Sequence, residues 1–174
     1  PGHATMIEAS FSLLDHDGRR VGPETYRGRW MLVFFGFTHC KVVCPRNLAK
    51  LSAMLDGLGP AADDIVPLYI TVDPERDTPE RMRTWLGEHY PRFTGLTGPR
   101  EEIDAARRAF RVFAQRRPET TPGGYDVPHT AIAYLLDRDG RFRDHFPETR
   151  SEAEIREGIA GLLASDAGHA GPPA

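Results

Sequence analysis

The chain contains two cysteines, Cys40 and Cys44, within the segment FGFTHCKVVCP at residues 35–45. The apolar run at residues 30–35 leads directly into this segment, and the residues after it have the composition of a helix. The two sulfurs are therefore expected where a buried strand passes into a helix N-terminus, whose backbone N–H groups and dipole stabilise thiolates. Positions i and i+4 of a helical turn lie on one face, about 6 Å apart. That spacing suits a disulfide, and it also suits a soft metal ion held by two thiolates.

The rest of the sequence predicts strands that alternate with helices. Expected strands are residues 11–15, 30–36, 65–72, 130–136 and 141–146, and expected helices are 45–58, 78–89, 100–112 and 151–164. Residues 117–125 are rich in Pro and Gly and are expected to form an irregular loop. This alternation indicates an α/β protein, and a redox-type cysteine pair after the central strand narrows it to a thioredoxin-like fold. We expect a central mixed sheet flanked by helices, with a strand and hairpin as an N-terminal extension.

A third donor is expected from His129, which directly precedes the predicted strand at 130–136. In a thioredoxin-like fold, the loop that leads into that strand comes beside the cysteine turn. Two thiolates and one imidazole form a soft donor set that suits copper, above all Cu(I), and can also hold Cu(II). Zinc accepts the same donors but usually takes a fourth. The alternatives are two buried structural thiols and a histidine that only caps its loop by hydrogen bonding.

Length and composition limit the remaining possibilities. At 174 residues the chain is expected to form one domain with its own core. We expect a loose lead-in at residues 1–10, the folded domain at 11–164 and a disordered tail at 165–174. The net charge of −3, with arginines scattered among acidic residues, gives no case for a nucleic-acid partner. No apolar run approaches the roughly 20 residues of a membrane span.

Three motifs resemble the Sco/SenC family, copper-binding thioredoxin-fold proteins that serve assembly of the CuA centre of cytochrome c oxidase. They are FGFTHCKVVCP at 35–45, TVDPERDTP at 71–79 and HTAIAYLLD at 129–137, in the family's order and spacing. The resemblance extends over about residues 10–163. In that family the two motif cysteines and the later histidine bind copper, which corresponds here to Cys40, Cys44 and His129.

The resemblance also implies a partner and a location. The expected partner is the copper-site subunit of cytochrome c oxidase or another copper chaperone. Family members act outside the cytoplasm, in the bacterial periplasm or the mitochondrial intermembrane space, and of these we expect the bacterial periplasm for this chain. The full-length form is expected to be anchored to the membrane by a segment that would precede Pro1.

Two positions depart from the family's pattern. The family commonly has Pro-Asp after the first cysteine, where this chain has Lys41 and Val42. A cation at position 41 favours thiolate. The family also commonly has Asp before the histidine, where this chain has Pro128, so an acid that could orient the imidazole is missing. Val127 and Pro128 before a buried strand resemble the cis-proline loop of thiol–disulfide oxidoreductases, which favours redox chemistry.

These residues are consistent with three functions. Because only some of the three are enzymatic, the sequence leaves open whether the chain is an enzyme. The leading hypothesis is a metallochaperone that binds one copper and cycles its cysteines through a disulfide. The second is a thiol–disulfide oxidoreductase that reduces a target's cysteine pair. Its nucleophile would be Cys40, which lies nearer the helix start and is expected to have a lowered pKa. A peroxidase ranks third, because Thr38-His-Cys40 resembles part of a peroxiredoxin site but lacks that family's proline before the threonine.

Acidic and histidine residues near the motifs are assigned supporting roles. Asp73 and Asp77 are expected to cap the turn and helix beside the cysteines and so to maintain the shape of the site. They could instead form a hard-metal site. His39 adjoins Cys40 and is expected to be peripheral.

Overall fold

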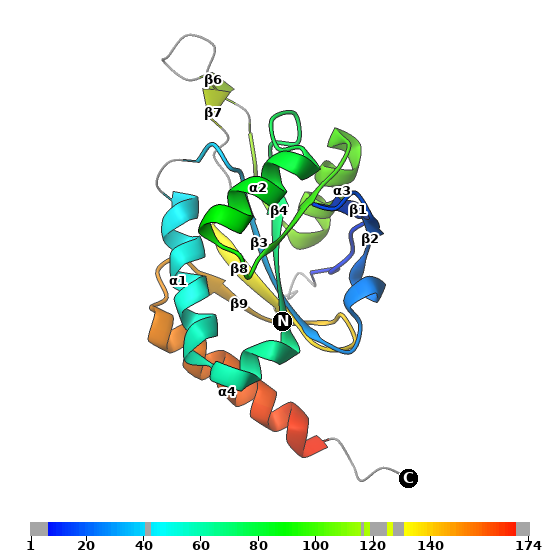
Figure 1. Cartoon of the computed structure of the whole chain (residues 1–174). Coiled ribbons are helices and arrows are strands. Elements are labelled where there is room, and N and C mark those ends of the chain that lie inside the picture. The colour runs from blue at the N-terminus through cyan, green and yellow to red at the C-terminus, as the bar shows by residue number, and fades with distance from the viewer. Residues whose placement is uncertain (1–6, 41–42, 116, 119–124, 127–130, 170–174) are drawn as a thin grey trace, which may run out of the picture.

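The structure, a computed structural model of the chain, describes residues 7–40, 43–115, 117–118, 125–126 and 131–169. A seven-stranded mixed sheet forms its centre, with the strand order β2-β1-β5-β4-β3-β8-β9 (Figure 1). The strands are β1 (Leu13–Asp15), β2 (Arg20–Val21), β3 (Trp30–Gly36), β4 (Ile65–Thr71), β5 (Thr94–Thr97), β8 (Ile132–Leu136) and β9 (Phe142–Pro147). β3, β4 and β5 are parallel, and the other neighbouring pairs are antiparallel.

Helices cover both faces of the sheet. They are α1 (Val43–Gly57), α2 (Pro79–His89), α3 (Arg100–Phe110) and α4 (Glu152–His169), with short 3-10 helices η1 (Pro23–Tyr26) and η2 (Gly59–Asp64). α1, α2 and α4 pack on one face, and α3 packs on the other (Figure 1). Within the described part of the chain, no helix is long and apolar enough to span a membrane.

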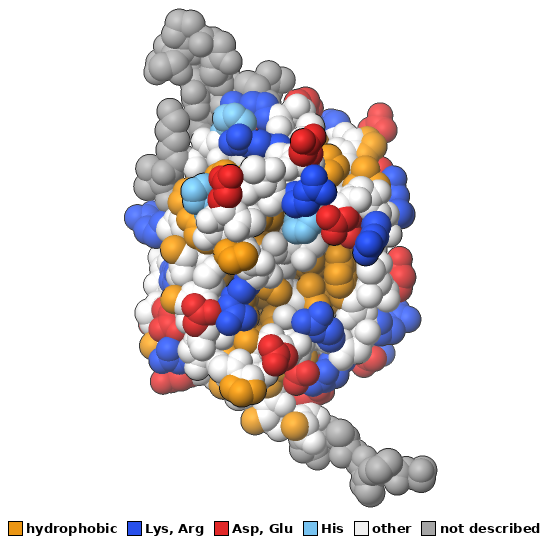
Figure 2. Space-filling view, in the orientation of Figure 1, with side chains coloured by type: hydrophobic (Ala, Val, Ile, Leu, Met, Phe, Trp, Pro, Cys, Tyr) orange, Lys and Arg blue, Asp and Glu red, His pale blue; other side chains and the backbone are white. Residues whose placement is uncertain are grey.

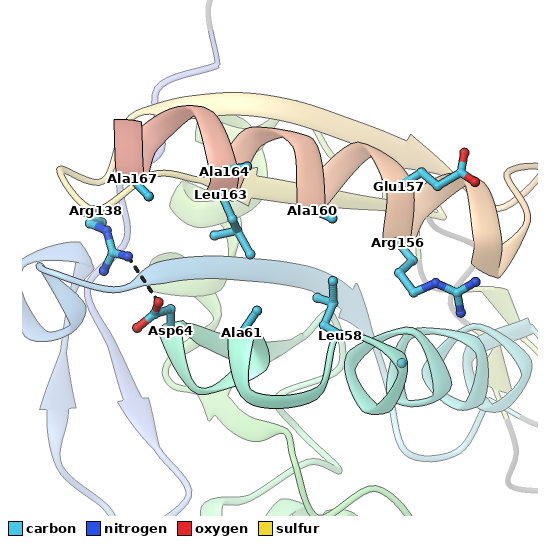
Figure 3. A pocket seen from close by; sticks show the side chains of 11 residues that line it. Leu58, Ala61, Asp64, Arg138, Arg156, Glu157, Ala160, Leu163, Ala164 and Ala167 are labelled. Carbon is cyan, nitrogen blue, oxygen red and sulfur yellow. Dashed lines mark hydrogen bonds and ion pairs between the residues drawn. The ribbon is translucent and has the colours of Figure 1, made fainter. Parts of the chain in front are cut away.

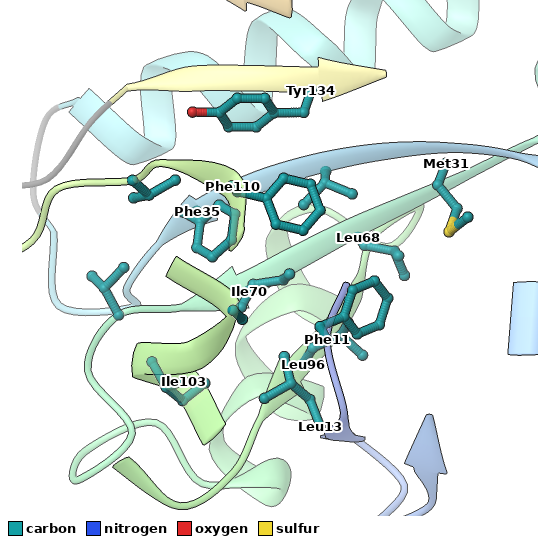
Figure 4. Packing of buried hydrophobic residues seen from close by; sticks show 14 of the residues in the cluster. Phe11, Leu13, Met31, Phe35, Leu68, Ile70, Leu96, Ile103, Phe110 and Tyr134 are labelled. Atoms are coloured by element: carbon teal, nitrogen blue, oxygen red, sulfur yellow. The ribbon is translucent and has the colours of Figure 1, made fainter. Parts of the chain in front are cut away.

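β3 is buried on both faces, and the cysteine turn begins at its carboxyl end. Its even-numbered residues from Trp30 to Phe34 pack in the cluster that includes α1, α2 and α4. Its odd-numbered residues from Met31 to Phe35 pack in the cluster under α3, where the rings of Phe35 and Phe110 lie 5.4 Å apart (Figure 4). An uninterrupted apolar run is typical of a strand that is covered on both sides, which is why the sequence predicted β3 correctly.

Most predicted elements occur close to their expected bounds. The strands expected at 30–36 and 65–72 are β3 and β4, and the expected hairpin is formed by β8 and β9. The N-terminal strand and hairpin are β1 and β2, so the predicted thioredoxin-like arrangement has its extension at one edge of the sheet. α1 begins at Val43 rather than at residue 45, which places Cys44 in its first turn.

Two strand features were not predicted. β5 lies between β4 and β1, although its four residues include Gly95. A Cβ at Gly95 would lie 2.9 Å from the Cβ of Met82, so the glycine allows α2 to pack closely on this strand. Part of the expected irregular loop at 117–125 instead forms a two-stranded ribbon of β6 (Arg117–Pro118) and β7 (Tyr125–Asp126).

Both ends of the described chain are more ordered than expected. α4 continues to His169, five residues beyond the predicted end at residue 164, so residues 165–169 are helical rather than part of a disordered tail. Arg138 Nε donates to Asp166 Oδ2 at 2.9 Å, and this contact ties the added turns to the end of β8. At the other end, Ile7 and Ala9 pack against the core cluster under α3, within the expected loose lead-in.

Thr78 provides a local test of how α2 is positioned. Its side-chain oxygen accepts a hydrogen bond from the backbone N–H of Arg81 at 3.2 Å, which is the N-cap that the sequence predicted. Replacing Thr78 by Ala is expected to lower the free energy of unfolding by about 1 kcal/mol, measured by urea denaturation. Thr84→Ala, an exposed change inside the same helix, is the control and should cause no loss. Equal effects of the two changes would show that the cap does not stabilise α2.

Candidate metal centre

The cysteine turn, residues 37–40, connects the end of β3 to the start of α1. Cys40 N donates to Phe37 O at 3.2 Å, which closes the turn. The backbone N–H of Cys44 then donates to Cys40 Sγ at 3.5 Å. Cys40 is partly exposed and Cys44 is fully buried, and no disulfide joins them. The structure therefore brings both sulfurs together at the helix start, as predicted, with Cys40 partly exposed and Cys44 buried.

The two thiols have different environments. The hydrogen bond with Cys40 and burial both raise the pKa of the Cys44 thiol, while the Phe37 backbone and the Tyr69 hydroxyl act in the opposite direction. Burial and the Cys40 contact therefore disfavour the charged form of Cys44. Cys40 is the more accessible sulfur and accepts a backbone N–H at a helix start, so the geometry favours Cys40 as the nucleophile.

Tyr69 lies behind Cys44 and was missed by the sequence reasoning. Its hydroxyl donates to Phe37 O at 3.1 Å and also interacts with the Cys44 side chain. Burial is the main cause that raises the pKa of Tyr69 well above its usual value. Gly36 makes room for this hydroxyl, because a Cβ at Gly36 would lie 2.3 Å from the Tyr69 oxygen. A polar residue in the otherwise aliphatic strand at 65–70 was the signal that could have identified it.

Asp77 joins the cysteine turn to the sheet. Its carboxylate accepts hydrogen bonds from Thr38 N at 3.0 Å, Thr38 Oγ1 at 2.6 Å and Thr71 Oγ1 at 2.7 Å. Its backbone carbonyl accepts from Thr97 Oγ1 at 2.7 Å. Burial raises the pKa of Asp77, and the hydrogen bonds from Thr38 and Thr71 oppose that shift. The predicted supporting role of Asp77 is confirmed.

Asp73 stabilises the loop between β4 and α2, which also contains Asp77. The side chain is fully buried, and its Oδ2 accepts from Arg76 Nε at 2.5 Å. Its carbonyl accepts from the backbone N–H groups of Arg76 and Asp77. Asp73 and Asp77 therefore act as turn-forming groups whose oxygens are already hydrogen-bonded, and a hard-metal site is not supported.

His129, the predicted third ligand, lies outside the described residues, as do Lys41, Val42 and Pro128. Among the residues that the structure does describe, no three His, Cys, Asp or Glu side chains form a cluster that could hold a metal ion. The neighbouring strand gives one relevant observation. Ala133 of β8 pairs antiparallel with Phe34 of β3, so the chain enters β8 from the same end of the sheet at which β3 passes into the cysteine turn.

A separate hollow lies at the other end of α1, between η2 and α4 (Figure 3). Its lining consists largely of apolar side chains, among them Leu58, Ala61 and Ala160. Its polar groups include Arg138, which pairs with Asp64 at 3.3 Å. The lining carries no thiol or imidazole among the described residues, so this hollow is not a candidate soft-metal site.

Known proteins show the same sequence pattern and fold. The SCO1/SenC family model matches residues 1–164. The human protein SCO1 homolog, mitochondrial, is 41% identical over 157 residues, which is 89% of this chain and 52% of that protein. The chain thus spans about half the length of this curated relative.

Two solved structures with copper bound are similar over nearly their whole length. ScoI of Arabidopsis thaliana has a TM-score of 0.86 and 34% identity, covering 91% of this chain and 99% of that one. ScoI of Bradyrhizobium japonicum has a TM-score of 0.79 and 39% identity, covering 91% and 98%. These similarities confirm the predicted thioredoxin-like fold. The chain belongs to the SCO1/SenC family.

Proposed function

We propose that this chain is a copper-binding metallochaperone domain that carries one copper as its cargo, held by Cys40, Cys44 and His129. The observation that carries the proposal is the pair of sulfurs in one turn at the start of α1, linked by an N–H···S hydrogen bond. Two soft sulfurs at this spacing suit copper. Family relatives with copper bound, at 34% and 39% identity, support the same cargo.

The surroundings of the two sulfurs fit this role. Copper binding requires both thiols to lose their protons, so the resulting negative charge must be stabilised. Cys40 accepts the N–H of Cys44, and at Cys44 the Phe37 backbone and the Tyr69 hydroxyl partly offset the burial and the Cys40 contact that raise its pKa. His129 is proposed as the third ligand because it directly precedes β8, whose entry lies at the cysteine end of β3.

The recipient of the copper is proposed from the family resemblance. We propose the copper-site subunit of cytochrome c oxidase, or a second copper chaperone, as the partner. We also propose a location outside the cytoplasm, with the periplasm and a membrane tether as the specific prediction for a bacterial protein. The human relative is mitochondrial.

Thiol–disulfide exchange is the second candidate function, and the asymmetry of the cysteines favours it. The Cys40 thiolate would attack a target disulfide and form a mixed disulfide, releasing one target thiolate. Cys44 would then attack Cys40, which releases the second target thiolate and leaves a Cys40–Cys44 disulfide. A peroxidase is not supported, because Thr38 is buried and its hydroxyl donates to Asp77.

An anaerobic copper titration of the fully reduced protein tests the proposal. Sulfur-to-Cu(II) charge-transfer absorption and competition with a Cu(I) chelator should reveal one tight equivalent. His129→Ala should weaken binding by at least about tenfold, and the Cys40→Ser, Cys44→Ser double variant should abolish tight binding. His145→Ala, at an exposed histidine on β9, is the control and should change nothing.

Two outcomes would contradict the proposal. Equally tight copper binding by the double serine variant would exclude the cysteines as ligands. Weak binding that does not depend on His129 would show that this chain has lost the metal site, and thiol–disulfide exchange would become its function.

A further inference from the structure

Two arginines lie against the cysteine turn, and we call them the arginine rim: Arg76 and Arg81. The guanidinium carbon of Arg76 lies 6.0 Å from the centroid of the Phe37 ring. Arg81 Nε donates to Thr38 Oγ1 at 3.2 Å. The ring of His39 reaches the same hydroxyl, with Nδ1 at 3.4 Å. All three residues that precede Cys40 in the turn are therefore linked to the arginine rim. Phe37 and Thr38 contact it directly, and His39 contacts the Thr38 hydroxyl that Arg81 binds.

Two acidic residues of this region lie beneath the rim, and two others are exposed: Glu75, which pairs with Arg100, and Glu80 in the first turn of α2. Asp73 and Asp77 are fully buried, and their carboxylates accept hydrogen bonds from protein donors. Arg81 is exposed, and the side chain of Arg76 is 20% exposed. Two guanidinium groups therefore lie beside the turn with their nearest carboxylates buried, although the whole chain has a net charge of −3.

The two guanidinium groups lie beside successive residues of the turn, Arg76 over the Phe37 ring and Arg81 on the Thr38 hydroxyl. Figure 2 shows basic side chains near the upper edge of the visible face, with acidic side chains close by. The contacts of Arg76 and Arg81 place two of the positive charges directly beside the cysteine turn.

Arg81 is oriented for binding a carboxylate. It lies in the first turn of α2, where its backbone N–H is held by the Thr78 cap, and its Nε is held by Thr38. Among the described residues, neither Nη group of Arg81 has a hydrogen-bond partner. A guanidinium fixed in this way presents N–H donors whose planar geometry matches a carboxylate.

We propose that the arginine rim is the contact surface for an acidic partner protein, which approaches Cys40 with carboxylates beside its own thiols or metal ligands. The proposal rests on the proposed function in one respect, that a partner must reach Cys40. Complementary charge increases the rate of such encounters and orients the two surfaces. The chain's overall negative charge would otherwise repel an acidic protein, so a local positive entrance is what makes this class of partner accessible.

The test compares small disulfides of different charge. Reduced protein reacts with dithiodipropionate, which is anionic, hydroxyethyl disulfide, which is neutral, and cystamine, which is cationic. Each rate is divided by the rate of a free thiol peptide with the same reagent to remove intrinsic reactivity. The anionic reagent should be the fastest and the cationic one the slowest. The difference should shrink as salt rises from about 10 mM to about 500 mM.

Matched variants assign the effect to the rim. Arg81→Gln should lower the anionic-to-cationic rate ratio by about threefold or more at low salt. Arg81→Lys keeps the charge and should retain most of that ratio for small reagents. Arg83→Gln removes the same charge two residues further along α2, where the arginine has a long 3.8 Å ion pair with Asp17, and should leave the ratio unchanged.

A second arm separates an acidic protein surface from a free small anion. Peptide disulfides flanked by Asp should react faster than the same disulfides flanked by Lys, with the same dependence on Arg81. Preference for the small anion without preference for the acidic peptide would overturn the proposal, and so would equal effects of Arg81→Gln and Arg83→Gln. The assay contains no copper, so a negative result would not contradict the proposed copper site. A protein that fails to bind copper can still be tested for its charge preference.

Discussion

Replacing Asp77 by Ala is expected to lower the free energy of unfolding by about 4 kcal/mol, because three hydrogen-bond donors would lose their acceptor inside the protein. Thr38 supplies two of these donors and Thr71 supplies the third. Thr38 and Thr71 are themselves buried, so water cannot replace the carboxylate without opening the structure. The loss should release the cysteine turn from β4 while leaving the sheet itself intact.

Urea denaturation gives the change in free energy, and thiol reactivity gives its location. In Asp77→Ala, the buried Cys44 should react with a thiol reagent faster than in the parent protein under native conditions. Asp104→Ala is the control, because Asp104 is partly exposed on α3 and pairs with Arg107 at 2.7 Å. Such surface pairs contribute up to about 1 kcal/mol. A loss in Asp77→Ala no larger than that of the control would show that the turn does not depend on this carboxylate.

The elements that could be predicted from sequence are those whose signal is local. β3 is an uninterrupted apolar run, β4 is mostly apolar, and α2 begins with Thr78 followed by proline, so each carries its own signature. β5 carries none, since Thr94–Thr97 contains a glycine and has no apolar alternation. It is a strand because β4 and β1 pair with its two edges, and that information lies elsewhere in the chain.

The same distinction applies to the last helix. The sequence predicted its start, but the added turns up to His169 include a contact between Asp166 and Arg138, which are far apart in sequence. A sequence pattern contains no sign of such a contact. The N-terminal residues that pack under α3 were missed for the same reason.

Likewise, only part of the candidate site could be predicted from the sequence. The cysteine spacing and the acidic loop could be identified because both are short motifs. The contact between Asp77 and Thr38 joins residues 39 positions apart, and the fold alone brings Tyr69 behind Cys44. His129 as the third ligand stays a prediction, which the copper titration tests.

Gly36→Ala is the second change with a large expected effect, because Gly36 and the Tyr69 ring share one space. A Cβ at this position would lie 2.3 Å from the Tyr69 hydroxyl oxygen and 2.7 and 2.8 Å from two ring carbons. Tyr69 is fully buried and stacks near Phe34 and Trp85, with ring centroids 6.1 and 6.0 Å away, so it cannot move aside without disturbing that packing. We expect a loss of about 3 kcal/mol in the free energy of unfolding.

A double-mutant cycle assigns this loss to the contact. Tyr69→Leu removes the hydroxyl and both ring carbons, so Gly36→Ala should cost much less in the Tyr69→Leu background than in the parent. Tyr69→Phe removes the oxygen alone and should rescue only in part. Gly87→Ala on α2 is the matched control, since nothing lies within 4 Å of a Cβ there, and it should cause no loss. If Gly36→Ala has no effect on stability, or has the same cost in both backgrounds, the contact does not cause the loss.

Gly36→Ala should also weaken copper binding, because the displaced Tyr69 ring moves a hydroxyl that interacts with Cys44. Gly87→Ala should bind copper as tightly as the parent protein does.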